Sequence, residues 1–285
     1  MNRIILGILS AAVTMGIAPL LAQQGPPIFQ LTWVDRQGAM TRIGALPPGT
    51  FAPRLSPDGR RVAFDTFDGS VWIAELANLA AAKRFGAGRF PMWSPDGSRL
   101  LFAGPKGFQL FWQSSDGSGT PELIAETARA PESWSPATRL VSYITLTGAS
   151  DYDVWAFSPD DRSQRALLAT PTTAQMSSRF STDGKWLAYQ SNENGRYEIY
   201  VEPFPRTGAR TQITDAGGER PVWSPDGREI IFDRDATLHA VVVDTSAAFT
   251  AKAPVALPVK GFVQSTGRRL WDVAPDGSRF LMMFP

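Results

Sequence analysis

The stretch W-S-P-D-G-S-R-L-L-F at residues 93–102 decides the fold, because its pattern recurs along most of the chain. A large apolar residue precedes a Ser-Pro-Asp-Gly turn, and an apolar run follows, which predicts two antiparallel strands joined by a tight turn. Proline presets one dihedral of such a turn, aspartate bonds the nearby backbone, and glycine accepts the strained position. Related copies begin at Leu55, Trp134, Phe180, Trp223 and Val273.

The spacing of the copies predicts the architecture. Their turns begin at Ser56, Ser94, Ser135, Ser181, Ser224 and Ala274, with successive differences of 38, 41, 46, 43 and 50 residues. Aromatic-bearing strands follow the copies, as in S-V-W-I-A-E-L at 70–76, and a less apolar edge strand comes next. A period of about 40–45 residues is typical of a propeller blade. We therefore predict an all-β fold, a six-bladed β-propeller of four-stranded blades.

The two ends of the chain are predicted to share the last blade. The sixth copy reaches Pro285 after only two strands. The segment F-Q-L-T-W-V-D-R-Q-G-A-M-T-R-I-G-A-L at 29–46 offers the missing two, joined by a turn at 35–38. These N-terminal strands would close the ring and make residues 23–285 a single domain. Five blades with frayed ends is the alternative.

Residues 1–22 resemble a secretory signal peptide. Arg3 precedes an apolar run that Pro19 interrupts, and Ala22 stands before the polar sequence Q-Q-G-P-P. This pattern predicts export, so residues 23–285 would lie in the periplasm or outside a bacterial cell. The alternative is an uncleaved anchor, which would be the only contact with the membrane.

Composition excludes several kinds of site. The 285 residues include no cysteine and only one histidine, and the formal net charge is +1. Disulfides and thiolate metal sites are therefore excluded, and a nucleic-acid partner, which needs a concentrated basic surface, is not expected. The sequence contains no G-x-S-x-G, P-loop or H-E-x-x-H motif. We expect no catalytic residue, no metal, no cofactor and a monomeric domain.

Two residue types that suggest chemistry have simpler structural interpretations. Five of the turns have one aspartate each, which is expected to hydrogen-bond the backbone of that turn rather than to bind a metal ion. These aspartates are Asp58, Asp96, Asp183, Asp226 and Asp276. His239 stands where other copies carry tryptophan or tyrosine, so we expect it to fill an aromatic position.

The W-S-P-D-G repeat resembles the TolB-like, WD-repeat-like propeller family of bacteria. The segments L-T-W-V-D-R-Q-G at 31–38 and W-D-V-A-P-D-G-S-R-F-L-M at 271–282 resemble one subgroup more closely. That subgroup is the extracytoplasmic propellers attached to some bacterial Ser/Thr kinases, although this sequence has no kinase motif. The third copy departs from the pattern, because Ala137 and Thr138 replace Asp-Gly. Its turn should therefore differ.

Topology predicts where a partner would bind. In a propeller, the loops that enter the inner strands open on one face, together with the loops between second and third strands. We call this the loop face, and the opposite face, with the Ser-Pro-Asp-Gly turns, the turn face. Arginine side chains on the loop face would suit the binding of carboxylates or phosphates. The candidate binding residues are Arg89, Arg129, Glu219, Arg220, Arg268 and Arg269 from the first set of loops, and Asp151, Tyr152, Glu193 and Arg196 from the second.

These features predict an exported, non-catalytic binding or scaffold module that recognises a protein, peptide or glycan through its loop face. The first alternative is that the charged loop residues are simply exposed to water and bind no partner. A second alternative is a propeller-type hydrolase or lyase, similar to a glycosidase or lactonase, that uses axial carboxylates. A third is a sensor propeller that is a fragment of a receptor-kinase-like protein.

Overall fold

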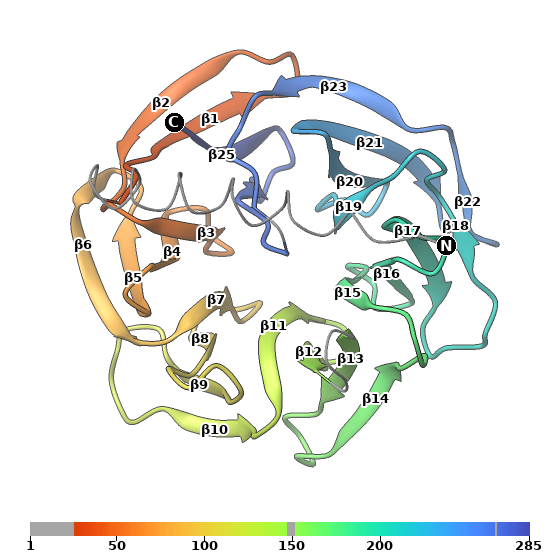
Figure 1. Ribbon diagram of the computed structural model, residues 1–285, viewed down its shortest axis with the longest axis horizontal. Coiled ribbons are helices and arrows are strands. Elements are labelled where there is room, and N and C mark those ends of the chain that lie inside the picture. The colour runs from red at the N-terminus through yellow and green to blue at the C-terminus, as the bar shows by residue number, and fades with distance from the viewer. Residues whose placement is uncertain (1–25, 147–151, 266) are drawn as a thin grey trace, which may run out of the picture.

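The computed structural model describes residues 26–146, 152–265 and 267–285, and within these ranges the chain is all-β. Six sheets stand in a ring around a central axis (Figure 1). The predicted signal peptide at 1–22 lies outside the described residues. Within the described ranges, no helix has the length and apolarity needed to span a membrane.

The first three blades follow one another along the chain. Blade one consists of β3 (Thr50–Leu55), β4 (Arg61–Thr66), β5 (Ser70–Glu75) and β6 (Asn78–Ala87). Blade two consists of β7 (Arg89–Trp93), β8 (Arg99–Ala103), β9 (Leu110–Ser114) and β10 (Glu122–Ala125). Blade three consists of β11 (Ala128–Trp134), β12 (Val141–Leu146), β13 (Tyr152–Phe157) and β14 (Gln164–Leu168).

The other three blades complete the ring. Blade four consists of β15 (Gln175–Phe180), β16 (Trp186–Ser191), β17 (Glu198–Pro203) and β18 (Thr211–Gln212). Blade five consists of β19 (Glu219–Trp223), β20 (Glu229–Arg234) and β21 (Thr237–Asp244), with β22 (Thr250–Ala251) and β23 (Val255–Lys260) pairing with different stretches of β21 along the outer edge. Blade six consists of β24 (Trp271–Val273), β25 (Arg279–Phe284), β1 (Gln30–Asp35) and β2 (Met40–Ala45).

Blade six confirms the predicted closure. The N-terminal strand β1 pairs antiparallel with the C-terminal strand β25, with Leu31 opposite Met283 and Trp33 opposite Leu281. Leu31, Leu281 and Met283 are fully buried and pack in one cluster with Leu55 of blade one. The two ends of the described chain are therefore held together by backbone hydrogen bonds and by an apolar core.

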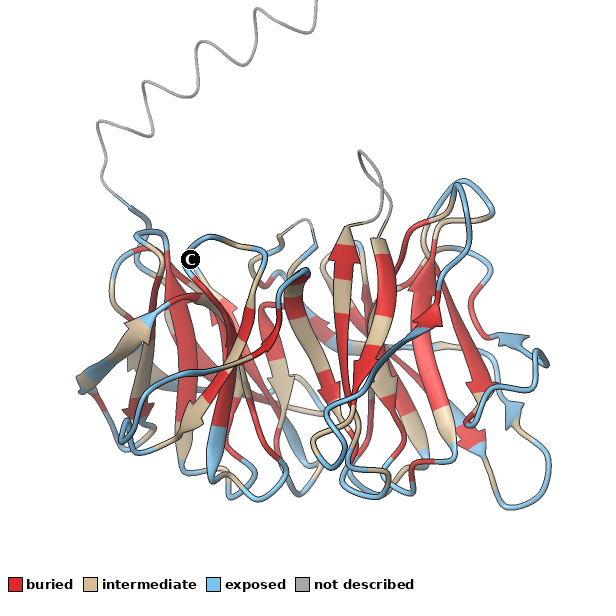
Figure 2. Cartoon of the chain, turned by 90° about the horizontal axis from the view of Figure 1, so that it is seen from below, coloured by how far each residue is buried: buried red, intermediate tan, exposed pale blue. Residues whose placement is uncertain are grey.

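The apolar core is divided among the interfaces between blades. Each hydrophobic cluster joins two neighbouring sheets; one, for example, combines Leu101 and Trp112 of blade two with Val141 and Tyr143 of blade three. Figure 2 shows buried residues concentrated in the strands, between exposed loops at both faces. This packing follows from the alternation of each strand, which sends apolar side chains to both neighbouring blades.

The turn at 94–97 has the predicted chemistry. The Ser94 hydroxyl donates to Asp96 Oδ1 at 2.6 Å, and Asp96 accepts the backbone N–H of Ser98 at 3.0 Å. Ser94 Oγ also accepts the N–H of Arg99 at 2.9 Å, which closes the turn. The same Ser–Asp bond recurs at Ser56, Ser181 and Ser224. Among the described residues, no group of three acidic or histidine side chains could hold a metal ion.

The three turn tryptophans each contact the preceding blade, two through a hydrogen bond and the one in the divergent third copy through ring stacking. Trp93 donates its indole N–H to the Arg54 carbonyl oxygen at 3.0 Å, and Trp223 donates to that of Arg179 at 3.0 Å. Trp134 instead stacks on Trp112 of blade two, with ring centroids 5.9 Å apart.

His239 occupies an aromatic position, as expected. Its ring is stacked on Phe232 with centroids 5.2 Å apart, and only 6% of the residue is exposed. Burial and the neighbouring Arg234 lower the pKa of His239, so the imidazole is neutral at pH 7.

Candidate functional site

A cavity of about 240 Å³ opens at the axis on the loop face. Its walls come from blades one to four and from the loop before β24 of blade six. Residues that line it include Arg54, Phe90, Arg129, Glu132, Tyr152, Met176, Arg179, Arg268 and Arg269. Most of these side chains stand on inner strands, so the rigid ring, rather than a single loop, positions the site.

Arg54 of β3 and Arg179 of β15 supply positive charge from two different blades. Arg54 Nη1 donates to the carbonyl oxygens of Pro53 at 2.7 Å and Arg269 at 3.0 Å. Arg179 Nη1 donates to the carbonyl oxygens of Ser178, at 2.7 Å, and Glu132. Burial, reinforced by the charge of Arg269, lowers the pKa of Arg179 to about 9. The same two causes hold the pKa of Arg54 well below its usual range.

Glu132 is the acidic residue in the cavity wall, and it is tied to β15. Its carboxylate accepts the backbone N–H groups of Ser177 and Ser178, the latter at 2.8 Å, together with the Ser178 hydroxyl. Burial raises the pKa of Glu132, and these hydrogen bonds oppose that rise. Glu132 thus fastens blade three to blade four.

An arginine–aromatic rim borders the cavity on the loop face, on blades one, two and three and the loop before β24. We define it as Phe51, Phe67, Phe90, Phe108, Arg129, Tyr152 and Arg268. The Arg268 guanidinium lies 4.2 Å from the ring centroid of Phe90 and 5.3 Å from that of Phe51.

Similar contacts join the other rim residues. The rings of Phe51 and Phe67 pack edge to face, with their centroids 4.3 Å apart. Arg129 lies 5.7 Å from the ring centroid of Phe108 and 6.0 Å from that of Tyr152. Phe67 is 53% exposed and Phe108 49% exposed. The rim therefore presents apolar rings and cations together to solvent.

The structure brings together four of the sequence-predicted candidates. Arg129, Tyr152, Arg268 and Arg269 all line the axial cavity. Arg268 also donates to Asp65 Oδ2 at 3.0 Å, and Arg269 donates to Asp272 Oδ1 at 2.9 Å.

The other candidates lie elsewhere. Arg220 forms a buried ion pair with Asp233 and also contacts Glu219 at 2.9 Å. Arg89 donates to the Phe67 carbonyl oxygen at 3.1 Å, beside the rim.

Glu193 pairs with Arg210 and Arg196 with Glu198, each at 2.6 Å, outside the cavity lining. Asp151 lies outside the described residues.

Sequence reasoning missed Arg54 and Arg179, because it considered only loop residues. A signal was available, however. Both stand two residues before a turn serine, next to the apolar residue that packs between blades. Alternation along a strand turns that neighbouring position away from the packing interface.

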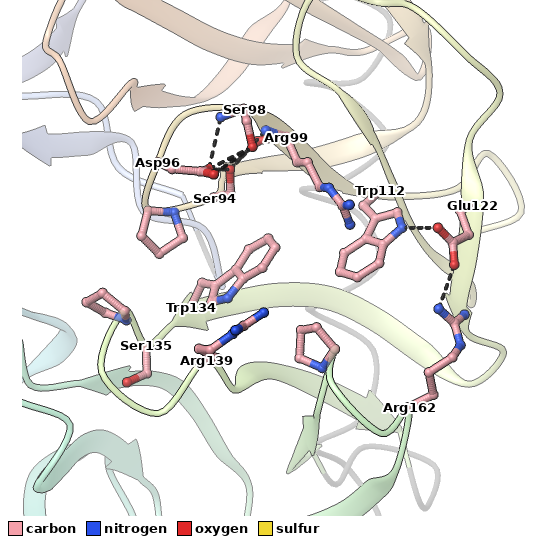
Figure 3. A pocket seen from close by; sticks show the side chains of 13 residues that line it. Ser94, Asp96, Ser98, Arg99, Trp112, Glu122, Trp134, Ser135, Arg139 and Arg162 are labelled. Carbon is pink, nitrogen blue, oxygen red and sulfur yellow. Dashed lines mark hydrogen bonds and ion pairs between the residues drawn. The ribbon is translucent and has the colours of Figure 1, made fainter.

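A larger cavity of about 690 Å³ lies on the turn face between blades two and three (Figure 3). Trp112 and Trp134 form its aromatic wall, and the Arg99 guanidinium lies 4.3 Å from the Trp112 centroid. Glu122 accepts from Trp112 Nε1 and from Arg162, both at 2.6 Å.

Two of the three arginines among the described lining residues of this second cavity form ion pairs within the protein. Arg162 pairs with Glu122, and Arg139 pairs with Asp160 at 2.8 Å. In the axial cavity, Arg268 and Arg269 each bind one aspartate, but Arg54 and Arg179 donate to backbone carbonyls instead. We therefore place the candidate site at the axis, although that cavity is smaller.

The fold and the axial cavity define this chain as a six-bladed β-propeller with a cationic cavity that opens at the centre of its loop face. The chain belongs to the TolB β-propeller family, because the family model described as the TolB beta propeller domain matches residues 22–256. This finding confirms the family predicted from the repeat. The predicted likeness to kinase-attached propellers stays a prediction.

Solved structures share the fold. A putative TolB from Agrobacterium tumefaciens superposes with a TM-score of 0.69 at 20% identity, over 90% of this chain and 98% of that one. TolB from Acinetobacter baumannii gives a TM-score of 0.57 at 14% identity, over 98% of this chain and 71% of that one.

A curated relative is described as the uncharacterized peptidase YuxL of Bacillus subtilis (strain 168). It is 25% identical over an alignment of 204 residues, and the match covers 65% of this chain and 29% of that protein. The chain therefore spans less than a third of that relative's length.

Proposed function

We propose that this propeller is an exported, non-catalytic binding module that receives a protein or peptide partner on its arginine–aromatic rim. The observation that carries the proposal is the rim itself. Phe67 and Phe108 remain about half exposed, and Arg129 and Arg268 are stacked against aromatic rings. Aromatic residues and arginine dominate the binding energy of protein interfaces, and contiguous exposed rings mark interaction surfaces.

Rigidity supports the same role. The rim residues are attached to strands of a ring closed by the pairing of β1 with β25, so little ordering is needed on binding. The signal-like sequence at 1–22 supports a location outside the bacterial cytoplasm, where an extracytoplasmic protein or peptide would be the partner.

The axial carboxylates favour binding over hydrolysis. Glycoside hydrolysis needs two carboxyl groups that both reach the substrate. Asp65 instead binds Arg268, Asp233 binds Arg220, and Glu132 binds the Ser178 backbone. The name of the Bacillus subtilis relative describes a peptidase, but this sequence lacks the G-x-S-x-G motif of serine hydrolases. We therefore carry no activity over from that protein.

Crosslinking of the exported protein in cells, followed by mass spectrometry, tests the proposal. The recovered partner should crosslink to loop-face residues, and its affinity for purified protein can then be measured. Phe108→Ala and Arg129→Ala should each weaken binding by roughly 30-fold, the effect of losing a hot-spot residue. Arg228→Ala, on the exposed turn face, is the control and should bind as the wild type does. Crosslinks confined to the turn face, or rim variants of unchanged affinity, would overturn the proposal.

A further inference from the structure

Three arginines converge on the axial cavity from separate blades. Arg54 comes from β3, Arg179 from β15, and Arg269 from the segment just before β24. Arg269 and Arg179 both lower the pKa of Arg54, and Arg269 lowers that of Arg179, in addition to the effect of burial. Like charges held together in a partly buried site repel one another, so this arrangement is costly without a compensating anion.

The protein's own acceptors do not use all the donors of these side chains. Arg269 is only 7% exposed, and its Nη1 donates to Asp272, but its buried Nε has no hydrogen-bond partner. Arg54 and Arg179 donate to backbone carbonyls, which carry no full negative charge. A buried guanidinium donor without an acceptor is rare, because no hydrogen bond compensates for the hydration that it loses.

The charge balance of the cavity is positive. Among the described residues that line it, five are arginines and one is a glutamate. Two further carboxylates lie just behind the lining, Asp65 on Arg268 and Asp272 on Arg269. Even when all three carboxylates are counted, the five arginines outnumber them. A concave site of one sign with low-dielectric walls concentrates the opposite ion.

The size of the cavity limits what can enter. Its volume of about 240 Å³ is enough for several water molecules. That space admits a carboxylate or phosphate group with a short attached chain. Guanidinium groups bind such oxyanions through paired, charge-assisted hydrogen bonds.

We propose that the axial cavity is an oxyanion site, in which Arg54, Arg179 and Arg269 bind a carboxylate or phosphate group. The oxyanion can be a free small molecule or an acidic group presented by the partner docked on the rim. Only the second source rests on the proposed function. The oxyanion site itself can be tested on the purified protein alone.

The experiment titrates purified exported protein with succinate or inorganic phosphate, each against sodium chloride of matched ionic strength. Calorimetry should show saturable binding, and the melting temperature followed by tryptophan fluorescence should rise with oxyanion concentration, because the ligand binds only the folded state. A response to neither oxyanion beyond the chloride control would overturn the proposal.

Variants locate the site. Arg54→Gln and Arg179→Gln should each weaken oxyanion binding at least about tenfold, the loss of one charge-assisted interaction. Arg228→Gln makes the same change in net charge on the turn face and should leave affinity within about twofold of wild type. Equal weakening by Arg228→Gln and Arg54→Gln would show a general charge effect and overturn the proposal.

The melting temperature without oxyanion distinguishes a binding role from a structural one. Removing Arg54 relieves repulsion from Arg179 and Arg269 but also removes its hydrogen bonds to the Pro53 and Arg269 carbonyls, so Arg54→Gln should change the melting temperature little. A lower melting temperature, together with unchanged oxyanion affinity, would assign Arg54 a structural role and refute the site.

A third arm identifies the source. A short peptide ending in glutamate, compared with its amide-capped glutamine version, reports on partner-borne carboxylates. Binding of succinate but not of the acidic peptide would support the oxyanion site while counting against a peptide partner. Binding of the acidic peptide, lost in both Arg54→Gln and Phe108→Ala, would support both proposals together.

Discussion

Replacement of Asp233 by asparagine tests the buried ion pair that anchors blade five. Asp233 of β20 accepts the Arg220 Nε at 2.9 and 3.1 Å, and Arg220 Nη2 as well. It also accepts the indole N–H of Trp271 from blade six at 3.1 Å. Asparagine keeps the shape and one acceptor oxygen, so the substitution removes mainly the charge.

The burial of this ion pair sets the expected loss in the free energy of unfolding. Arg220 is 7% exposed and Asp233 is 1% exposed, so the remaining arginine cannot recover its hydration. Burial opposes the charge of Arg220, yet its hydrogen bonds and attraction to Asp233 raise the pKa of Arg220 overall. Breaking a buried pair costs about 3–5 kcal/mol. Because Glu219 still contacts Arg220, we expect about 3 kcal/mol, or roughly 6–12 °C in melting temperature.

Urea unfolding followed by tryptophan fluorescence measures this loss. Asp215→Asn, at an exposed position before β19, is the matched control and should leave the free energy of unfolding unchanged within error. In the double variant Arg220→Met/Asp233→Asn, the two losses should not add, with a coupling of about 2 kcal/mol. A loss below about 1 kcal/mol in Asp233→Asn would refute the reasoning and return Arg220 to the candidate binding residues.

Two further predictions concern the repeated motif. Hydrogen bonds from Ser94 and Ser98 lower the pKa of Asp96, so its stabilisation is present above the ordinary value of about 3.9 and is lost as pH falls through the folded value. The melting-temperature difference between wild type and Asp96→Ala at pH 7 should therefore shrink as the pH is lowered below that ordinary value; a difference that does not change with pH would contradict it. Trp93→Phe should lower the free energy of unfolding by about 1–3 kcal/mol in urea titrations, because the Arg54 carbonyl loses its donor; equal stabilities would contradict it.

The candidate site was only partly readable from the sequence. Arg129, Tyr152, Arg268 and Arg269 were expected on the loop face and do meet at the axial cavity. Arg220 belongs to the same set of loops, yet its side chain turns into the interface with blade six and binds Asp233. Membership of a loop predicts the face of the ring, but it does not predict the direction of a side chain.

The sequence by itself determined the propeller, because its signals are local and repeated. Turn chemistry at Ser94–Gly97, alternation along each strand and a regular period are properties of short segments. Even the closure could be deduced from the two strands missing after the sixth turn, and β1 pairs with β25 as that count required.

Only the tertiary structure decided where charge accumulates. Arg54 and Arg269 are 215 residues apart, yet the side chain of one donates to the backbone of the other. Their approach depends on the rotation between blades and on which strand positions face the axis. No local pattern encodes these quantities, because they arise only when all the blades pack around a common centre.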